Sequence, residues 1–323
     1  MMDRTEYMNA MRAQTFGVEV EMNNITREQA ARVAAKLFGT EHTVKYLGEG
    51  YYTWGCFDAQ GRSWKFQRDV SIHGDDEHKC EMVTPVLHYE DMEMLQQLIR
   101  DLRHAGAKSS PSRGCGIHIH IGGDGHTPQS IRNLVNLMYQ HEDQLIKGIG
   151  VAESRLYHYC QKTSQYFVDE LNKKRPKTIT DLSDCWYGCA GTSGYGHYDS
   201  SRYRTLNLHA FFHRYHTVEF RLFQFDEEGN GRKGGLHAGQ LKAMIQLCLA
   251  MNQFAKTQKT IYPRKQQTND MDAYRAWFTR IGLIGDEFKT CRLYLTRGFM
   301  TTNEWRHSDE HRTTMVESGR WAV

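Results

Sequence analysis

Three stretches of the sequence place charged or imidazole side chains two residues apart, between apolar residues. The stretches are TFGVEVEM, GCGIHIHIGG and TVEFRLF, and the pairs are Glu19 with Glu21, His118 with His120, and Glu219 with Arg221. Successive side chains of a β-strand point to opposite faces of a sheet, so each pair is expected on one face and the apolar residues on the other. Two further predicted strands add Asp69, on one face with Ser71, and Glu81.

Several carboxylates on one face of a sheet repel one another unless a cation lies among them. Oxygen ligands with one or two imidazoles suit Mg²⁺ or Mn²⁺ better than a structural Zn²⁺. Arg221, with Arg202 and Arg204 one predicted strand away, supplies planar guanidinium groups for phosphate or carboxylate. The set therefore predicts a nucleoside triphosphate site, and the absence of a G-x4-G-K-[ST] motif excludes a P-loop enzyme.

Each motif alone also has a structural interpretation. A single E-x-E is common on a solvated strand, an E-x-R pair is often a cross-strand ion pair, and an H-x-H is as often structural as ligating. Cys185 and Cys189 form one isolated C-x3-C, which is a weak metal signal without a second pair. The functional interpretation depends on the motifs occurring together.

The elements that must position these residues occur in groups, not in strict strand–helix alternation. Strands are predicted at 15–22, 54–57, 61–64, 64–72, 80–86, 117–121, 203–211 and 217–225. Helices are predicted after Thr26, which makes a capping box with Gln29, and after Thr127, which is followed by Pro128. Others are expected at 89–106, 236–255, 273–281 and 286–297. Grouped strands favour an α+β fold with a largely antiparallel sheet.

The composition is that of an ordinary globular protein. The 323 residues are expected to form one domain, in which 172–200 is a long loop and a candidate lid and 236–323 is a helical C-terminal part. With 41 Lys and Arg against 38 Asp and Glu, the net charge of +3 disfavours nucleic acid as a partner. No apolar run approaches the roughly 18 residues of a membrane span, and the eight scattered cysteines favour reduced thiols. A cytoplasmic protein is expected.

Five motifs, in this order along the chain, resemble those of the putative amidoligase family over about residues 14–300. They are FGVEVEM, D-x-S, E-x-V-T-P, GCGIHIHI and VEFR. That family belongs to the carboxylate–amine ligase superfamily of glutamine synthetase and glutamate–cysteine ligase. The resemblance implies a glutamine-synthetase-like curved sheet with helices packed on its convex side. It also implies that the concave face binds ATP and two or three Mg²⁺ or Mn²⁺ ions.

The resemblance further implies a role for each motif residue. One metal ion, bridging the β- and γ-phosphates, would be held by Glu19, His118 and Glu219. A second, nearer the substrate carboxylate, would be held by Glu21, Glu81 and Asp69. His120 would contact a phosphate, and Arg221, helped by Arg204, would stabilise the transferring phosphoryl group. The family more often has Glu where this chain has Asp69.

The implied reaction joins a carboxylate to an amine. ATP would convert the carboxylate to an acyl phosphate, which the amine would then attack to form an amide. Either substrate could be a small molecule or be carried on a peptide or protein, and the sequence leaves the oligomeric state open. The alternatives are a metal-dependent hydrolase that uses the H-x-H and carboxylate cluster, and a catalytically inactive nucleotide-binding module.

Overall fold

The computed structural model describes residues 3–48, 50–190, 199–213, 215–227 and 235–300. Its centre is an eight-stranded sheet, in the order β2-β3-β4-β5-β1-β6-β8-β7, and every neighbouring pair of strands is antiparallel. The strands are β1 Phe16–Met22, β2 Lys45–Gly48, β3 Thr53–Phe57, β4 Ser63–Gln67, β5 Cys80–Val83, β6 Ile117–Gly122, β7 Leu206–Asn207 and β8 Thr217–Phe223. The expected α+β class with an antiparallel sheet is confirmed.

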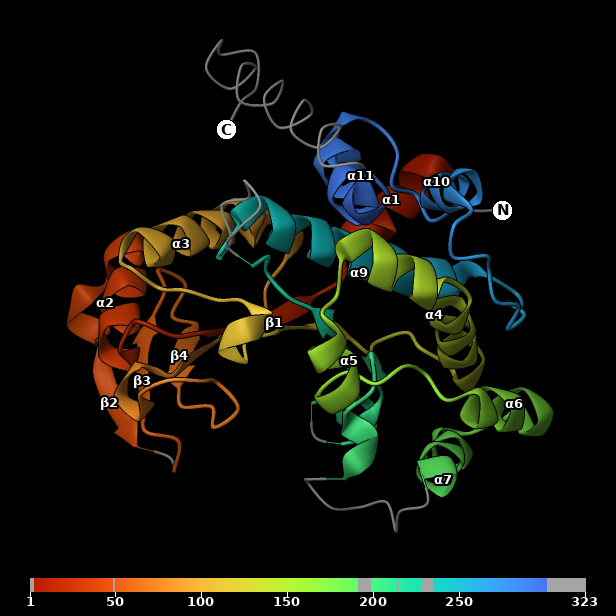
Figure 1. Cartoon of the computed structure of the whole chain (residues 1–323), viewed down its shortest axis with the longest axis horizontal. Coiled ribbons are helices and arrows are strands. Elements are labelled where there is room, and N and C mark those ends of the chain that lie inside the picture. Colours follow the sequence, from red (N-terminus) through yellow and green to blue (C-terminus); the bar gives the residue numbers. More distant parts are fainter. Residues whose placement is uncertain (1–2, 49, 191–198, 214, 228–234, 301–323) are drawn as a thin grey trace.

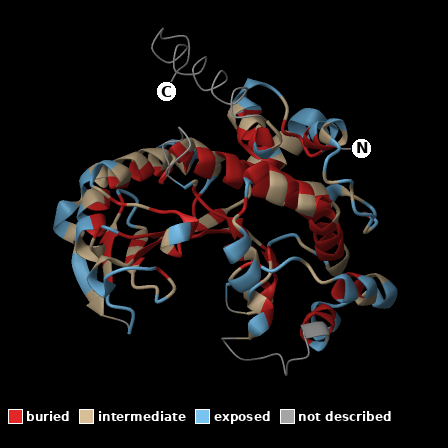
Figure 2. Ribbon diagram, in the orientation of Figure 1, coloured by how far each residue is buried: buried red, intermediate tan, exposed pale blue. Residues whose placement is uncertain are grey.

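Helices lie on more than one side of this sheet. They are α1 Arg4–Arg12, α2 Arg27–Phe38, α3 Met92–His104, α4 Pro128–Ile149, α5 Glu153–His158, α6 Gln165–Lys174, α7 Ile179–Ala190, α8 His209–Phe212, α9 Ala238–Thr257, α10 Met271–Arg280 and α11 Lys289–Thr296. Figure 1 shows α3, α9 and α4 side by side along the sheet, with α1, α10 and α11 on the far side of α9. Helix α9 is consequently buried on almost every side (Figure 2), and its polar residues Gln240, Gln246 and Asn252 are buried with the apolar ones.

The apolar residues of the central strands form the core against these helices. In β1 the side chains of Val18 and Val20 are buried, and in β6 Ile117, Ile119 and Ile121 are buried with them. Since side chains alternate along a strand, the polar residues between them lie on the opposite face of the sheet. The predicted alternation is therefore confirmed for β1 and β6.

The predicted loop at 172–200 is wrong for most of its length. Helix α6 starts at Ser164, whose hydroxyl accepts a hydrogen bond from the amide of Phe167, and it extends to Lys174. Helix α7 follows at Ile179–Ala190 and buries Leu182, Cys185 and Trp186, which have helical spacing. The glycine-rich composition that favoured a loop comes from 188–196, and 191–198 lie outside the described residues.

Three predicted strands are shorter than expected. The strand at 64–72 ends at Gln67, the strand at 80–86 ends at Val83 because Pro85 has no amide hydrogen to donate, and the strand at 203–211 contains only Leu206–Asn207. Asp69 therefore does not share a strand face with Ser71; its Oδ1 accepts hydrogen bonds from the Ser71 amide and hydroxyl, both at 2.6 Å, in a turn. After β7 the chain forms α8.

The C-terminal part, as far as it is described, contains α9, α10 and α11, with an irregular segment at 258–270 between the first two. Residues 301–323 of the predicted helical part lie outside the described residues. Several elements were not predicted, among them the N-terminal helix α1, the edge strand β2 and the helices α5 to α8. Within the described ranges, no helix combines the length and hydrophobicity needed to cross a membrane.

Candidate active site

Strand register brings the predicted ligands together on the polar face of the sheet. Glu19 of β1 lies opposite His118 of β6, and His120 of β6 lies opposite Glu219 of β8. On the other side of β1, Glu21 lies opposite Glu81 of β5. Four adjacent strands therefore supply this cluster of carboxylates and imidazoles.

His118 occupies the middle of the cluster and is buried. Its Nδ1 lies 2.9 Å from Glu19 Oε2 and 3.8 Å from Glu219 Oε1, and its Nε2 lies 3.8 Å from Glu21 Oε1. One imidazole thus contacts three carboxylates that come from two different strands.

His120 lies toward the β8 side of the cluster. Its Nδ1 is 3.0 Å from the Thr217 hydroxyl, and its Nε2 is 3.3 Å from Glu19 Oε1. This buried Nε2 has no partner with hydrogen-bond geometry among the described residues. Burial lowers the pKa of His120, but Glu19 and Glu219 outweigh it, and the net shift is upward.

Neighbouring groups orient the carboxylates. Gln67 Nε2 donates to Glu81 Oε2 at 2.8 Å, and Asn207 Nδ2 donates to Glu219 Oε2 at 2.6 Å. The Gly116 amide donates to Glu21 Oε2 at 2.5 Å. Sequence reasoning missed all three donors; Gln67 could have been found as the residue opposite Glu81, but only once the register was known.

Ligand atoms converge in three groups, each within 4.8 Å, among the described residues. The groups are Glu21 with Asp69 and Glu81, Glu19 with Glu81 and His118, and Glu19 with His120 and Glu219. The first is the set that the resemblance implied for the second metal. The third places His120, and not His118, with Glu19 and Glu219. Asp69 reaches the cluster from its turn although it is not on a strand.

The pKa shifts show that the negative charge of the cluster is only partly compensated by its own imidazoles. Burial raises the pKa of Glu81 well above its usual range, and the negative charges of Glu19, Glu21 and Asp69 raise it further. Burial also acts on Glu19, but the charges and hydrogen bonds of His120 and His118 hold its pKa well below the usual range. A divalent cation would relieve the repulsion at Glu81, so the donor set fits Mg²⁺ or Mn²⁺.

Arg221 lies on the same face and is bonded to Glu219. Its Nη1 donates to Glu219 Oε1 at 2.5 Å, and its Nε is buried without a hydrogen-bond partner among the described residues. Burial lowers the pKa of Arg221, but the negative charges of Glu219 and Glu19 outweigh the effect of burial, and the net shift of the Arg221 pKa is upward. Burial raises the pKa of Glu219, and the charge of Arg221 brings it below its usual value.

A second guanidinium, Arg155 of α5, adjoins this region and was not predicted. Its Nη2 donates to the Arg221 carbonyl at 3.1 Å, and its Nε is buried without a hydrogen-bond partner in the described part of the chain. The guanidinium lies directly over Gly116, where an added Cβ would be 2.2 Å from Nη1. Gly116, the second glycine of GCGIHIHI, is therefore required for this close approach.

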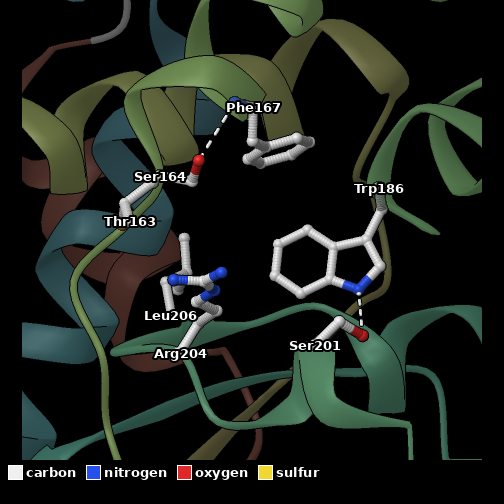
Figure 3. A pocket seen from close by; sticks show the side chains of 7 residues that line it. All are labelled: Thr163, Ser164, Phe167, Trp186, Ser201, Arg204 and Leu206. Atoms are coloured by element: carbon white, nitrogen blue, oxygen red, sulfur yellow. Dashed lines mark hydrogen bonds between the residues drawn. The ribbon is translucent and has the colours of Figure 1, made fainter. Parts of the chain in front are cut away.

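Arg202 and Arg204 were predicted beside Arg221 on a neighbouring strand. Both precede β7 instead; the guanidinium of Arg202 lies 5.9 Å from the centre of the Tyr203 ring. Arg204 donates from Nη1 to the Lys162 carbonyl at 3.0 Å and lines a separate pocket (Figure 3). No described contact joins Arg204 to the carboxylate cluster.

The C-x3-C motif provides no metal site within the described residues. Cys185 is a buried cysteine, and the side chain of Cys189 lies outside the described part. The three groups of converging ligands contain no cysteine.

A family model described as "Putative amidoligase enzyme" matches residues 12–252. The chain belongs to this amidoligase family. The match includes β1, β5, β6 and β8, which supply the cluster. It supports an enzyme, and a ligase as its type.

Comparisons with curated proteins and with solved structures do not extend this family assignment. No curated protein matches the chain. Among solved structures it is similar to a bifunctional glutathione synthetase from Pasteurella multocida, with 11% identity and a TM-score of 0.45. The alignment covers 99% of this chain and 52% of the synthetase, so the chain spans about half the length of that protein.

Proposed function

We propose that this amidoligase is an ATP-dependent carboxylate–amine ligase that works through an acyl phosphate. The observation that carries the proposal is the register of β5, β1, β6 and β8, which gathers buried carboxylates, two imidazoles and Arg221 on one face. Such a face can neutralise the charge of a triphosphate and of a carboxylate that reacts with it. A glutamine-synthetase-like curved sheet is the fold that we propose for it.

In this proposal Glu21, Asp69 and Glu81 hold one divalent ion, and Glu19 and Glu219 hold another with His118 or His120. Mg²⁺ or Mn²⁺ bound there would supply positive charge to the phosphate oxygens. Whichever imidazole is not a ligand contacts a phosphate. Arg221 directs its guanidinium at the phosphoryl group during transfer, and its buried, unbonded Nε is a donor available for that purpose.

The reaction would proceed in two displacements. A carboxylate oxygen attacks the γ-phosphorus, the bond to the bridging oxygen breaks, and ADP leaves. The amine nitrogen then attacks the acyl carbon, phosphate leaves and one proton is released. The products are an amide, ADP, phosphate and a proton. Activation is needed because the oxygen of a free carboxylate is a poor leaving group at neutral pH.

The acyl phosphate must be protected from water until the amine reacts. The segment 172–200, with α7, remains our candidate for the cover over the site, although it contains helix and not only loop. Seven described cysteines are buried, and we propose that they are reduced thiols and that the protein's location is the reducing cytoplasm.

A metal-dependent hydrolase is the second candidate, because imidazoles beside carboxylates also activate water. The deciding experiment is an ADP-release assay with pooled amino acids and polyamines, followed by mass spectrometry of the products. A ligase releases ADP only when ATP, a divalent ion and both substrates are present, and it yields a condensation product. Bond cleavage without nucleotide would favour the hydrolase instead.

Arg221→Lys distinguishes a transfer role from a structural role of Arg221. Removal of the Arg221 charge should lower single-turnover ADP formation by about 10²–10³ while ATP affinity changes much less. Lysine keeps the charge but loses the planar fork, so Arg221→Lys should recover only part of that rate. If Arg221 only steadies Glu219, the variant should lose stability and ATP affinity together, with an unchanged single-turnover rate per folded molecule.

A further inference from the structure

Arg155 of α5 is a buried cation beside the candidate active site. The residue is 3% exposed, which is close to the 5% of Glu21 and the 6% of Arg221 on the polar face of the sheet. Its Nη2 donates to the Arg221 carbonyl at 3.1 Å, and its Nε has no hydrogen-bond partner among the described residues. A guanidinium carries several N–H donors in one plane, so the fold leaves part of its hydrogen-bonding capacity for a ligand.

The guanidinium of Arg155 lies on the same face as the ligand cluster. The Glu21 amide donates to the Gly116 carbonyl at 3.1 Å, which continues the pairing of β1 with β6 to this glycine. Because side chains alternate along a strand, Gly116 shares the polar face with His118. An added Cβ at Gly116 would lie 2.2 Å from Arg155 Nη1, so the guanidinium covers that face. Figure 1 shows α5 on the side of β1 away from α9.

Within the described part of the chain, Arg155 forms no ion pair. The negative charge of Glu21, opposite Gly116, acts on it only from beyond ion-pair distance. Two thiols are near the guanidinium, but burial raises the pKa of Cys160 and raises that of Cys115 to about 12, so both are uncharged at neutral pH. A buried guanidinium whose direct partners are neutral can take a carboxylate or a phosphate in contact with it.

The position of Arg155 along β6 favours a carboxylate. Gly116 and His120 are four residues apart, which is about 13 Å in a strand. The ligand group of His120 includes Glu219, and Glu219 is bonded to Arg221, so the proposed function places the triphosphate at that end. Arg155 lies at the other end and next to the backbone of Arg221, where the second reactant must approach the transferring phosphoryl group.

We propose that Arg155 is a substrate-binding residue that contacts the carboxylate to be activated. One oxygen of this carboxylate attacks the phosphorus, and the guanidinium donates to the other oxygen, which becomes the carbonyl oxygen of the acyl phosphate. When the amine attacks, negative charge develops on that same oxygen, and the fixed guanidinium stabilises it until phosphate leaves. The identity of the anion as the acyl donor rests on the proposed ligase function.

Binding of acetate to the full chain tests this assignment, with acetamide as its uncharged counterpart of similar size. Saturation-transfer NMR titrations are done in Mg²⁺ without nucleotide. Arg155→Gln should weaken acetate binding at least roughly tenfold, through the loss of a charge-assisted hydrogen bond, and should leave acetamide binding within about twofold. Arg155→Lys is a second variant that keeps the charge, and it should retain part of the acetate affinity.

Arg292→Gln is the matched control for these substitutions. Arg292 of α11 also donates to backbone carbonyls, at 2.9 and 3.0 Å, but it lies away from the ligand cluster on the far side of α9. Its replacement should change the affinity for neither acetate nor acetamide.

The affinity for Mn²⁺, measured from the EPR signal of the free ion, separates this role from a structural one. Loss of a positive charge beside carboxylate ligands should leave Mn²⁺ binding unchanged or make it tighter. If Arg155 only ties α5 to β8, Arg155→Gln should weaken Mn²⁺ and acetate binding together and lower the melting temperature. That result would overturn the proposal.

Three other results would also overturn it: no acetate binding by the wild type, unchanged acetate binding by a folded Arg155→Gln variant, or a loss of ATP affinity alone, which would assign Arg155 to the nucleotide. The acetate titration needs neither ATP nor turnover. Its failure is therefore distinct from a failure of the ligase function, which the ADP-release assay measures.

Discussion

Replacing Glu81 with Gln should stabilise the metal-free protein while weakening its binding of divalent ions. Glu81 is buried, and its ligand oxygen lies within 4.8 Å of those of Glu21 and Asp69. Two unit charges at that distance repel by about 3 kcal/mol at an effective dielectric constant near 20. Protonation of Glu81 limits this cost, so we expect Glu81→Gln to raise the free energy of unfolding in EDTA by about 1–3 kcal/mol at pH 8.

The pH dependence has a defined sign. The pKa of Glu81 is raised well above its usual range, first by burial and then by the neighbouring carboxylates. A carboxyl group with a raised folded-state pKa stabilises the fold below its ordinary pKa and loses that contribution as the pH rises through the folded-state value. The metal-free wild type should therefore lose stability with rising pH, and Glu81→Gln should reduce that loss.

The assay is urea denaturation at pH 6, 7 and 8, in EDTA and in Mn²⁺ without nucleotide. Mn²⁺ at 100 times its dissociation constant should stabilise the wild type by about 2.7 kcal/mol, and the variant should show a clearly smaller gain. Glu41→Gln, an exposed carboxylate, is the control and should change neither quantity. A variant that is less stable than the wild type in EDTA at pH 8 would refute the repulsion argument.

Three further substitutions test other parts of the structure. Gly116→Ala places a Cβ 2.2 Å from the Arg155 guanidinium and should cost about 1–3 kcal/mol in urea denaturation, whereas Gly188→Ala, with no atom nearby, should not destabilise. His120→Ala and His118→Ala should each weaken Mn²⁺ binding in calorimetry, because each imidazole shares a ligand group with two carboxylates. Burial lowers the pKa of His141 to about 4, so stability is lost as the pH falls from about 6.5 toward 4; His141→Phe should reduce that acid loss by about 2 kcal/mol.

Each of these three predictions has an outcome that would contradict it. Equal costs for the two alanine substitutions would mean that Arg155 moves aside freely. A loss of Mn²⁺ affinity confined to His118→Ala would restore the grouping that the family resemblance implied. An unchanged acid loss in His141→Phe would mean that His141, stacked on Trp277 with ring centres 4.0 Å apart, takes up its proton without disturbing the fold.

The strand period was sufficient to predict the polar face of β1 and β6, because it is a local property of the sequence. Asp69 was predicted in the cluster, but from the wrong geometry: it belongs to a turn and not to a strand. Asn207 and Arg155 could not be predicted, since one lies in a two-residue strand and the other on a short helix. Their contacts depend on the arrangement of distant elements, of which the sequence carries no local pattern.

Strand register also explains which carboxylates lie beside each of the two histidines. His118 lies directly opposite Glu19, whereas His120 lies opposite Gly17 on one side and Glu219 on the other. Since side chains two residues apart on a strand share a face, the imidazole of His120 reaches Glu19 diagonally at 3.3 Å. An H-x-H motif places both rings on one face, but only the residues opposite them decide which carboxylates each ring meets. The register of β6 between β1 and β8 thus decides the neighbours of each imidazole as directly as the histidines do.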